Sequence, residues 1–296
     1  MTLAELIERT AARFDAASLF YGHGSDNARD EAAWLVLRGL GLPFGSELAR
    51  EVQREDVERI ERLAARRISE RVPLAYLLKE AWLAGQSFYV DERVIVPRSH
   101  IAELLHEPFL ARRGAVRILD LCTGSGCLAI LAARTFPGAQ IEAADISPAA
   151  LAVARKNVAR HRLGRRVHVR RSDLFADLGA TRYDLILTNP PYVGARAMGE
   201  LPPEYRREPR LALAGGADGL DLVARIVAAA GAHLAPDGLL VCEVGDAKAA
   251  VQRRFGRLGL RWPKAEVFSA GREALAAAAS TAACARTPAS RSRAKR

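Results

Sequence analysis

The sequence predicts an α/β fold, in which a mostly parallel sheet carries helices on both faces and a separate helical region precedes it. Between residues 99 and 268, five short apolar runs alternate with three helical stretches. Such alternation with short turns is typical of right-handed βαβ units, which build a parallel sheet. The first 83 residues show only the helical spacing of apolar side chains. A length of 296 residues accommodates both parts as separate domains.

Residues 1–83 are expected to form a small antiparallel bundle of helices. Apolar side chains recur at helical spacing in three stretches, residues 3–14, 34–37 and 57–68. Asp26 or Asn27 is placed to cap the second helix, and Pro73 is expected to end the third. The charged start of the chain is typical of the first turns of a helix rather than of a signal peptide.

A β-hairpin is expected to connect the two domains over residues 84–98. Apolar residues on both sides flank a charged turn, Asp91-Glu92-Arg93. The parallel-sheet domain is then expected to cover residues 99–269. The tail, residues 270–296, is rich in Ala, Ser, Thr and Arg and has no periodicity, which predicts a basic, disordered segment.

Five strands and three helices are predicted in the sheet domain. The strands are expected at residues 116–121, 140–144, 167–170, 183–188 and 238–244, and the helices at residues 127–135, 148–161 and 218–234. In open parallel sheets, ligands bind outside the carboxyl ends of the strands, where the strand order reverses. The motifs with chemical potential all lie at such ends.

A glycine-rich turn follows the first predicted strand. Its residues are Asp120, Leu121, Cys122, Thr123, Gly124, Ser125 and Gly126. Glycine allows the backbone to turn tightly and to approach a ligand closely. The third glycine of dinucleotide-binding turns is missing, because Ala129 occupies its position. The turn suits an amino-acid-bearing nucleoside, although a dinucleotide site or a purely structural turn would give a similar pattern.

Two acids end the next two predicted strands. Asp145 lies 19 residues after the glycine turn, where a carboxylate can accept hydrogen bonds from both hydroxyls of a ribose. Ser147 is the better candidate for capping the following helix, although Asp145 is an alternative cap. Asp173 can accept a hydrogen bond from an adenine amino group, with Leu174 or Phe175 against the ring, or it can stabilise a loop. Together with the glycine turn, these acids indicate a site for an adenosyl ligand.

The fourth predicted strand ends in Asn189-Pro190-Pro191-Tyr192, the most informative motif of the sequence. The side-chain oxygen of Asn189 and the backbone carbonyl of Pro190 can accept both N–H groups of a planar NH₂. Consecutive prolines have fixed φ angles and no N–H, so they form a rigid turn, and Tyr192 can pack on the planar group. The motif predicts methylation of an amide or an exocyclic amine through positioning and electrostatics. A plain Pro-Pro turn after a strand is the alternative.

The net charge of +10 leaves the class of partner open. The tail from residue 271 onward contains six cations and one acid, Glu273, so it carries a net charge of +5. The remaining +5 is expected to be spread over the body of the protein. Such charge favours RNA-rich or acidic partners, but a solvated arginine-rich surface without a partner would give the same net charge. No apolar run reaches the roughly 18 residues of a membrane span.

The remaining polar residues are weaker candidates for a function. His23 is expected to cap a helix. Arg98 and Glu103 are expected to line the ligand site or to pair with each other, and Glu243 to face the cleft or lie in solvent. The cysteines show no metal-binding spacing and are expected to be buried thiols of a reducing compartment. They are Cys122, Cys127, Cys242 and Cys284.

Three motifs taken together resemble those of the protein-glutamine methyltransferases that use S-adenosylmethionine. They are the glycine turn, Ala144-Asp145-Ile146-Ser147-Pro148 and Asn189-Pro190-Pro191-Tyr192. The chain is most similar to the branch that modifies the third-numbered protein of the large ribosomal subunit. The stretches that carry this likeness are residues 21–27, 81–82, 88–99, 204–205, 208–209 and 211–219. In the release-factor branch a proline usually follows Pro-Arg, where this chain has Ser99.

The resemblance, over about residues 14–268, implies a Rossmann-like class I methyltransferase sheet with S-adenosyl-L-methionine as cofactor. It implies methylation of a glutamine side-chain amide in a large-subunit ribosomal protein, in the cytoplasm. Ribosomal RNA or assembling particles are a further expected contact, and no membrane partner is expected. The expected cofactor-binding residues are Asp120, Cys122, Thr123, Gly124, Ser125, Gly126, Asp145, Asp173, Leu174 and Asn189. The expected catalytic residues are Asn189, Pro190 and Tyr192, with Pro191 added for substrate binding. The helical domain and the hairpin are expected to select the protein substrate.

Three other functions remain open from the sequence: methylation of a release factor, adenine-N6 methylation of nucleic acid, and a non-catalytic RNA-binding role. Members of the family also end with an antiparallel strand beside the fifth strand, usually after Gly-Asp-Gly. No such strand is readable here. Residues 261–268 are expected to form a single sixth strand. The position between the fifth and sixth strands of the sheet would then be empty, and the backbone groups facing it would be unpaired.

Overall fold

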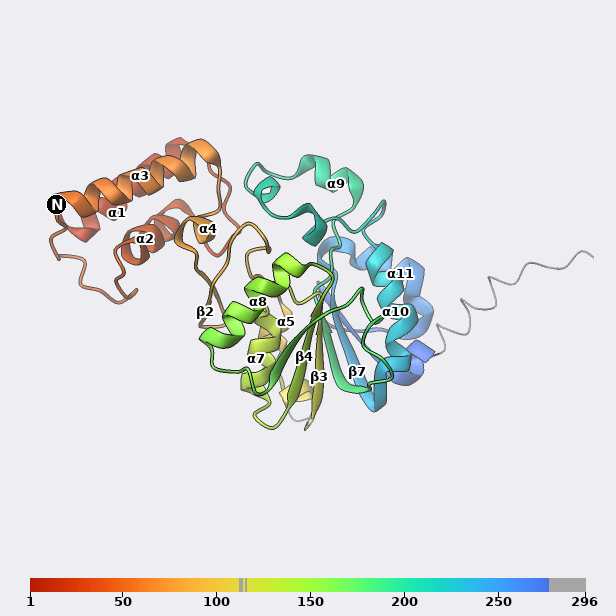
Figure 1. Cartoon of the computed structure of the whole chain (residues 1–296). Coiled ribbons are helices and arrows are strands. Elements are labelled where there is room, and N and C mark those ends of the chain that lie inside the picture. The colour runs from red at the N-terminus through yellow and green to blue at the C-terminus, as the bar shows by residue number, and fades with distance from the viewer. Residues whose placement is uncertain (112–113, 115, 277–296) are drawn as a thin grey trace, which may run out of the picture.

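The computed structural model describes residues 1–111, 114 and 116–276, and it has the predicted architecture (Figure 1). A group of helices at the N-terminus lies beside a seven-stranded sheet, which helices cover on both faces. The fold class predicted from the sequence, a Rossmann-like α/β sheet with a helical N-terminal part, is confirmed.

Four helices form the N-terminal part. They are α1 Leu3–Ala16, α2 Ala28–Gly39, α3 Arg54–Glu70 and α4 Leu74–Leu78. The predicted helical stretches are confirmed, and Asn27 rather than Asp26 caps α2. Their apolar faces share one buried cluster, which also includes Ala150 and Val153 of the sheet domain. The N-terminal helices are therefore packed onto the sheet domain rather than joined to it by the chain alone.

The connector contains a hairpin, but not where the sequence predicts it. Strands β1 Ala81–Leu83 and β2 Gln86–Phe88 pair antiparallel around Ala84 and Gly85, which both have positive φ. Asp91 begins a turn, in which its carbonyl accepts a hydrogen bond from the N–H of Val94 at 3.1 Å, but no paired strands flank this turn in the described residues 86–100. The Asp91 carboxylate accepts hydrogen bonds from Tyr89 and Arg93. The hairpin predicted over residues 84–98 is therefore wrong in position. The valines on both sides of Asp91 are buried in the N-terminal cluster rather than paired with each other.

The sheet contains β3 Arg117–Leu121, β4 Gln140–Asp145, β5 Val167–Arg171, β6 Tyr183–Thr188, β7 Leu234–Glu243, β8 Arg261–Lys264 and β9 Val267–Gly271. Its order is β5-β4-β3-β6-β7-β9-β8, in which the first five are parallel and β9 is antiparallel to both of its neighbours. The five predicted strands are confirmed. The strand order reverses between β3 and β6, so a crevice for a ligand is expected at the carboxyl ends of these strands.

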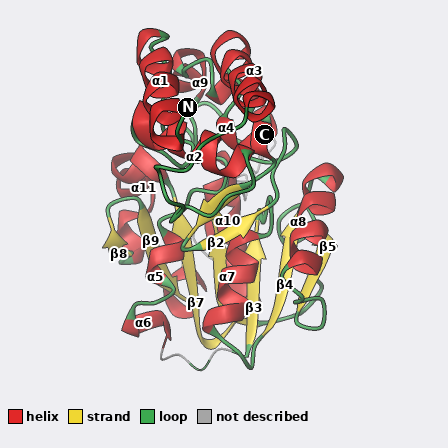
Figure 2. Cartoon of the chain, turned by 90° about the vertical axis from the view of Figure 1, so that its left-hand side faces the viewer, coloured by secondary structure: helices red, strands yellow, loops and turns green. Residues whose placement is uncertain are grey.

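Helices cover the sheet in two layers (Figure 2). One layer contains α5 Ile101–Leu104, α7 Cys127–Thr135 and α8 Pro148–Arg160, and the other contains α10 Asp221–His233 and α11 Lys248–Phe255. Because side chains alternate along a strand, Ile118 packs with the first layer and Leu119 with the second. The shorter elements are α6 Pro108–Ala111, α9 Ala195–Glu200 and four 3-10 turns, η1 Tyr205–Arg207, η2 Arg210–Ala212, η3 Gly245–Ala247 and η4 Gly256–Leu258.

The last part of the sheet differs from the prediction. Residues 261–268 do not form one strand, because the chain reverses at Ala265 and Glu266 between β8 and β9. The central strand is β9, with Phe268 paired opposite Cys242 of β7, so the slot that the sequence left empty is filled. The turn has no Gly, Asn or Asp to mark it, which is why the sequence pattern concealed it.

The beginning of the predicted tail is also part of the fold. Residues 272–276 are helical, and Leu275 is fully buried against Gly231 of α10. The prediction of a tail without structure from residue 270 is therefore wrong for its first residues. The predicted disorder of residues 277–296, together with Cys284, lies outside the described residues.

Replacing Phe268 with alanine tests the placement of β9 in the sheet. Phe268 is fully buried and its ring lies 5.8 Å from that of Trp262. The variant should lose about 3–5 kcal/mol of the free energy of unfolding, because a large buried side chain leaves a cavity. Urea unfolding measures this loss. The control Arg261→Ala, on the exposed edge strand, should stay within about 0.5 kcal/mol of wild type, and equal losses in both variants would contradict a central β9.

Candidate active site

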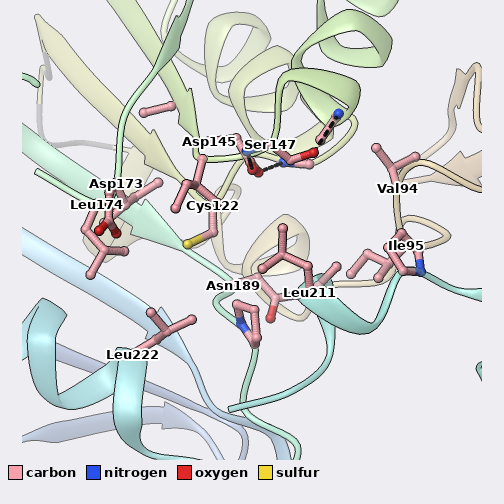
Figure 3. Close-up of a pocket in the computed structure, with 18 of the residues that line it drawn as sticks. Val94, Ile95, Cys122, Asp145, Ser147, Asp173, Leu174, Asn189, Leu211 and Leu222 are labelled. Atoms are coloured by element: carbon pink, nitrogen blue, oxygen red, sulfur yellow. Dashed lines mark hydrogen bonds between the residues drawn. The ribbon is translucent and has the colours of Figure 1, made fainter. Parts of the chain in front are cut away.

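A cavity opens at the carboxyl ends of the parallel strands, where the strand order reverses. Its volume is about 270 Å³, and its walls include the ends of β3, β4 and β6 and the start of α8. Two segments distant in sequence complete the walls, residues 93–95 of the connector and residues 209–212 beyond β6. Figure 3 shows Cys122 and Asn189 at the centre, with Asp173 on one side and Val94 on the other.

The predicted site residues divide into two groups around this cavity. Those that line it are Cys122, Gly124, Asp145, Asp173, Leu174, Asn189 and Pro191. Those that do not line it are Asp120, Thr123, Ser125, Gly126, Pro190 and Tyr192. All of these except Gly126 lie next to a lining residue in the chain, and their predicted contacts with a ligand stay predictions.

The two glycines of the turn are needed for different reasons. Gly124 has a φ of +54°, and a Cβ built on it would meet no atom within 4 Å, because that side faces open space. Gly126 has a φ of +81°, and its Cβ would come within 3.3 Å of the Cβ of Ala154 on α8. The first glycine therefore leaves room at the cavity, and the second lets the turn pack against a helix.

Asp120 lies behind the cavity rather than in it. Its Oδ2 atom accepts hydrogen bonds from Thr123 Oγ1 at 2.5 Å and from the backbone N–H of Ala129 at 2.9 Å. Asp120 thereby ties the glycine turn to α7. Burial raises the pKa of its carboxyl to about 7, against the opposing effect of these two hydrogen bonds. The predicted contact of Asp120 with a cofactor stays a prediction.

Asp145 lines the cavity, and the backbone holds both of its carboxylate oxygens. Oδ2 accepts a hydrogen bond from the N–H of Gly124 and Oδ1 accepts one from the N–H of Ser147, each at 2.9 Å. Ser147 caps α8, as predicted, so Asp145 is not the helix cap. Burial raises the pKa of the Asp145 carboxyl. Each oxygen keeps a second lone pair, which can accept a hydrogen bond from a ligand hydroxyl.

Asp173 lies at the rim of the cavity and is already paired. Nη2 of Arg225, on α10, donates to both of its carboxylate oxygens at 2.9 Å. Arg225 also lines the cavity, and the sequence analysis missed it because nothing in an apolar helix 52 residues away marks it. Leu174 lies in the same wall with a φ of +51°. The predicted contact of these residues with an adenine stays a prediction.

The connector holds the Asn189 side chain in one orientation. Its Nδ2 atom donates a hydrogen bond to the backbone carbonyl of Arg98 at 3.2 Å. A carbonyl only accepts, so the amide nitrogen must face Arg98 and Oδ1 must point away from it. Because Asn189 lines the cavity, this oxygen is free to accept a hydrogen bond from a ligand N–H group.

The rest of the motif shapes the wall beside Asn189. Pro191 lines the cavity, whereas Pro190 is buried and Tyr192 is half-buried. The Tyr192 ring lies close to Gly245, where an added Cβ would be 2.6 Å from Cε2 of the ring. Burial raises the pKa of the Tyr192 phenol. The predicted packing of Tyr192 on a planar group stays a prediction.

Arg98 is itself fixed by the carboxylate of Glu208. The two side chains form a bidentate pair with both N···O distances at 2.6 Å, and Glu208 also accepts from the N–H of Val96 at 2.8 Å. Burial alone would raise the pKa of Glu208, but the Arg98 hydrogen bonds hold it at about 2. The predicted pair of Arg98 with Glu103 is wrong, because Glu103 contacts Lys264 instead.

Glu204 ties the same loop to the N-terminal helices. Its Oε1 atom accepts hydrogen bonds from Arg67 and Arg71, each at 3.2 Å, and from the N–H of Phe20. Arg67 is fully buried and also pairs with Glu31 at 2.6 Å. The loop that forms one wall of the cavity is therefore bound to the helical part by ionic contacts.

His23 belongs to this contact and caps no helix, contrary to the prediction. It is buried, its ring lies 4.4 Å from the Tyr205 ring, and its Nε2 atom is 3.7 Å from Glu208 Oε1.

Glu243 is also buried rather than solvated. It accepts hydrogen bonds from Ser99 Oγ at 2.5 Å and from the N–H of His100 at 3.1 Å, so it holds the chain next to Arg98.

Metal binding and membrane insertion find no support in the part of the chain that the structure describes. There, no group of His, Cys, Asp and Glu is arranged to hold a metal ion. No helix in residues 1–111 or 116–276 is both long enough and apolar enough to cross a membrane. Cys122, Cys127 and Cys242 are free thiols, and the last two are buried.

Known proteins resemble this chain over most of its length. Residues 101–200 match the family model described as methyltransferase small domain. The ribosomal protein uL3 glutamine methyltransferase of Bordetella pertussis is 52% identical over 268 residues, which cover 88% of this chain and 90% of the relative. The protein of the same name from Burkholderia pseudomallei is 48% identical over 275 residues, with the same two shares. That from Bradyrhizobium diazoefficiens is 47% identical, over 88% of this chain and 86% of the relative.

Replacing Asp120 with asparagine should change how stability depends on pH. The pKa of this carboxyl is about 7 when folded, against about 3.9 in an unfolded chain. The folded state binds the proton more tightly, so this contribution to stability is complete below about pH 4 and lost as the pH rises through 7. Wild type should therefore lose stability relative to the variant by an amount on the order of a few kcal/mol between about pH 4 and pH 8. Urea unfolding at several pH values measures this, and a constant difference would disprove it.

Removing Glu208 should destabilise the fold, because Arg98 would lose the carboxylate that neutralises it. We expect Glu208→Ala to lower the free energy of unfolding by about 2–4 kcal/mol, below the range for a fully buried pair, since the Arg98 side chain is 28% exposed. Chemical denaturation measures the loss. The control Glu103→Ala removes the exposed partner of Lys264 and should change stability by less than about 1 kcal/mol. A similar effect in both variants would count against a structural role for the Arg98 pair.

Proposed function

The chain belongs to the family of ribosomal protein uL3 glutamine methyltransferases, and we propose that it methylates the side-chain amide nitrogen of a glutamine in that ribosomal protein. The observation that carries this proposal is the Asn189 amide, whose nitrogen is fixed on the Arg98 carbonyl at a cavity. Its oxygen is thus an oriented acceptor for the N–H of a planar amide.

We propose that S-adenosyl-L-methionine is the methyl donor, and the residues of the cavity fit it. The open side of Gly124 leaves space for the amino-acid end, and the spare lone pairs of Asp145 suit the two ribose hydroxyls. Leu174 offers an apolar surface beside Asp173 for the adenine. When bound, this cofactor supplies a methyl group on a positively charged sulfur.

Asn189 and Pro190 are proposed to hold the glutamine amide during transfer. An amide nitrogen is a poor nucleophile because its lone pair is delocalised. Two acceptors, the Asn189 oxygen and the Pro190 carbonyl, would bind its two N–H groups and favour a tetrahedral nitrogen. In the transfer, the nitrogen would gain a bond to the methyl carbon as the carbon–sulfur bond breaks, the sulfur would keep that electron pair, and the nitrogen would release one proton to water. Orientation and electrostatics therefore supply the rate enhancement, without a strong base.

The loop at residues 204–212 is proposed to help select the protein substrate. It forms one wall of the cavity and is bound to the N-terminal helices through Glu204 and to the connector through Glu208. A substrate that contacts the helices would therefore also contact the wall beside Asn189. We propose that the methylation of uL3 takes place in the cytoplasm, where uL3 binds ribosomal RNA. An adenine amino group offers similar chemistry, but the substrate of the relatives favours the amide.

Replacing Asn189 with alanine tests the amide-binding role. The variant should lose turnover by about 10²–10³-fold, because one oriented group that stabilises the transition state is removed. Transfer of labelled methyl from S-adenosylmethionine to purified uL3 measures the rate, and calorimetry measures donor affinity, which should be retained. The control Arg196→Ala, exposed on the nearby α9, should keep both. Near wild-type turnover in the Asn189 variant would refute the role.

A further inference from the structure

Helix α8 and the edge strand β5 carry a concentrated positive charge that the sequence analysis overlooked. Residues 146–172 contain eight cations and no acid, so they contribute +8 to a chain whose total charge is +10. The cations are Arg155, Lys156, Arg160, Arg162, Arg165, Arg166, Arg170 and Arg171. The expectation that the charge of the body is evenly spread is therefore wrong.

The fold gathers these cations on one edge of the sheet domain. Figure 2 shows α8 lying beside β5, the outermost strand on that side. All eight side chains are exposed except that of Arg166, which is half-buried. In the part of the chain that the structure describes, one of these eight cations forms an ion pair with a carboxylate, Arg170 with Glu142 at 3.1 Å. Most of the charge is therefore available to a partner.

The shape of this edge suits an extended anionic chain. α8 has 13 residues, which correspond to about 20 Å, and β5 runs beside it. A hollow lined by Arg155, Gly164 and His168 lies between the two elements. At the other end of β5, Arg171 is followed by Ser172 and Asp173, which line the cavity. The basic surface therefore extends to the rim of the candidate active site.

We propose that the surface formed by α8 and β5 binds the phosphodiester backbone of RNA. Exposed cations without carboxylate partners bind phosphates and release counterions, which gives affinity without base recognition. An anionic membrane fits less well, because the apolar side of α8 is buried against the sheet and the N-terminal helices, whereas membrane-surface helices expose theirs. The inference rests on the proposed function, because a ribosomal protein substrate is found together with ribosomal RNA.

Charge reversal on this surface tests the inference. The variant combines Arg155→Glu, Arg162→Glu and Arg165→Glu, three exposed positions that do not line the cavity. Its binding to a fluorescein-labelled RNA hairpin is measured by anisotropy over a series of salt concentrations. We expect at least tenfold weaker binding. The slope of log affinity against log salt concentration should also be smaller in magnitude by about 2–3, since each phosphate contact contributes about 0.7–0.9 to that slope.

A matched variant separates this surface from net charge. Arg253→Glu, Arg257→Glu and Arg261→Glu make the same change of charge at exposed positions near the opposite edge of the sheet, and this variant should bind RNA within about threefold of wild type. Equal losses in the two variants, or no binding of RNA by wild type, would overturn the inference. Tighter binding to vesicles that contain anionic phospholipid than to RNA would also overturn it.

The methylation assay distinguishes failure of this inference from failure of the proposed function. Methyl transfer to isolated uL3, without RNA, should be the same in the α8–β5 variant and in wild type. Loss of RNA binding with intact methyl transfer is the expected result. Absence of methyl transfer in wild type, with RNA binding as described, would reject the proposed function and leave the RNA-binding surface in place.

Discussion

The bidentate ion pair between Arg98 and Glu208 is the interaction on which the arrangement of the site depends. It joins residues 110 positions apart in the chain. The backbone carbonyl of Arg98 orients Asn189, while its guanidinium holds the loop that forms one wall of the cavity. A buried ion pair stabilises a structure only when its polar atoms are hydrogen-bonded. Here the N–H of Val96 donates a further hydrogen bond to Glu208. One residue therefore couples the connector, the strand-end motif and the loop beyond it.

Carboxylates work mainly behind the cavity in this protein. Asp120 braces the glycine turn, Glu243 holds the chain next to Arg98, and Glu204 binds the N-terminal helices. Asp145 lies in the wall, but its oxygens also fix the backbone of the turn. This distribution suits a reaction in which a weak nucleophile needs orientation more than it needs a base.

The sequence predicted those parts of the fold and the site that local patterns determine. Strand ends, the glycine turn, the cap at Ser147 and the position of Asn189 all follow from residues close together in the chain. The partners that complete the site do not. Arg225 and Glu208 reach their partners through folding, and nothing near them in the sequence marks that contact. The last strand was missed for a related reason, since its turn lacks the residues that usually reveal one.

The position of β9 has a consequence for how the protein is made. In the sheet, β9 lies between β7 and β8 but follows both in the chain. During translation, β8 leaves the ribosome before β9, its neighbour in the sheet, and the edge of β7 stays open until Gly271 emerges. An open strand edge is a template for aggregation. A nascent chain that ended before β9 would keep that edge permanently, so quality control of this protein is expected to depend on the synthesis of β9.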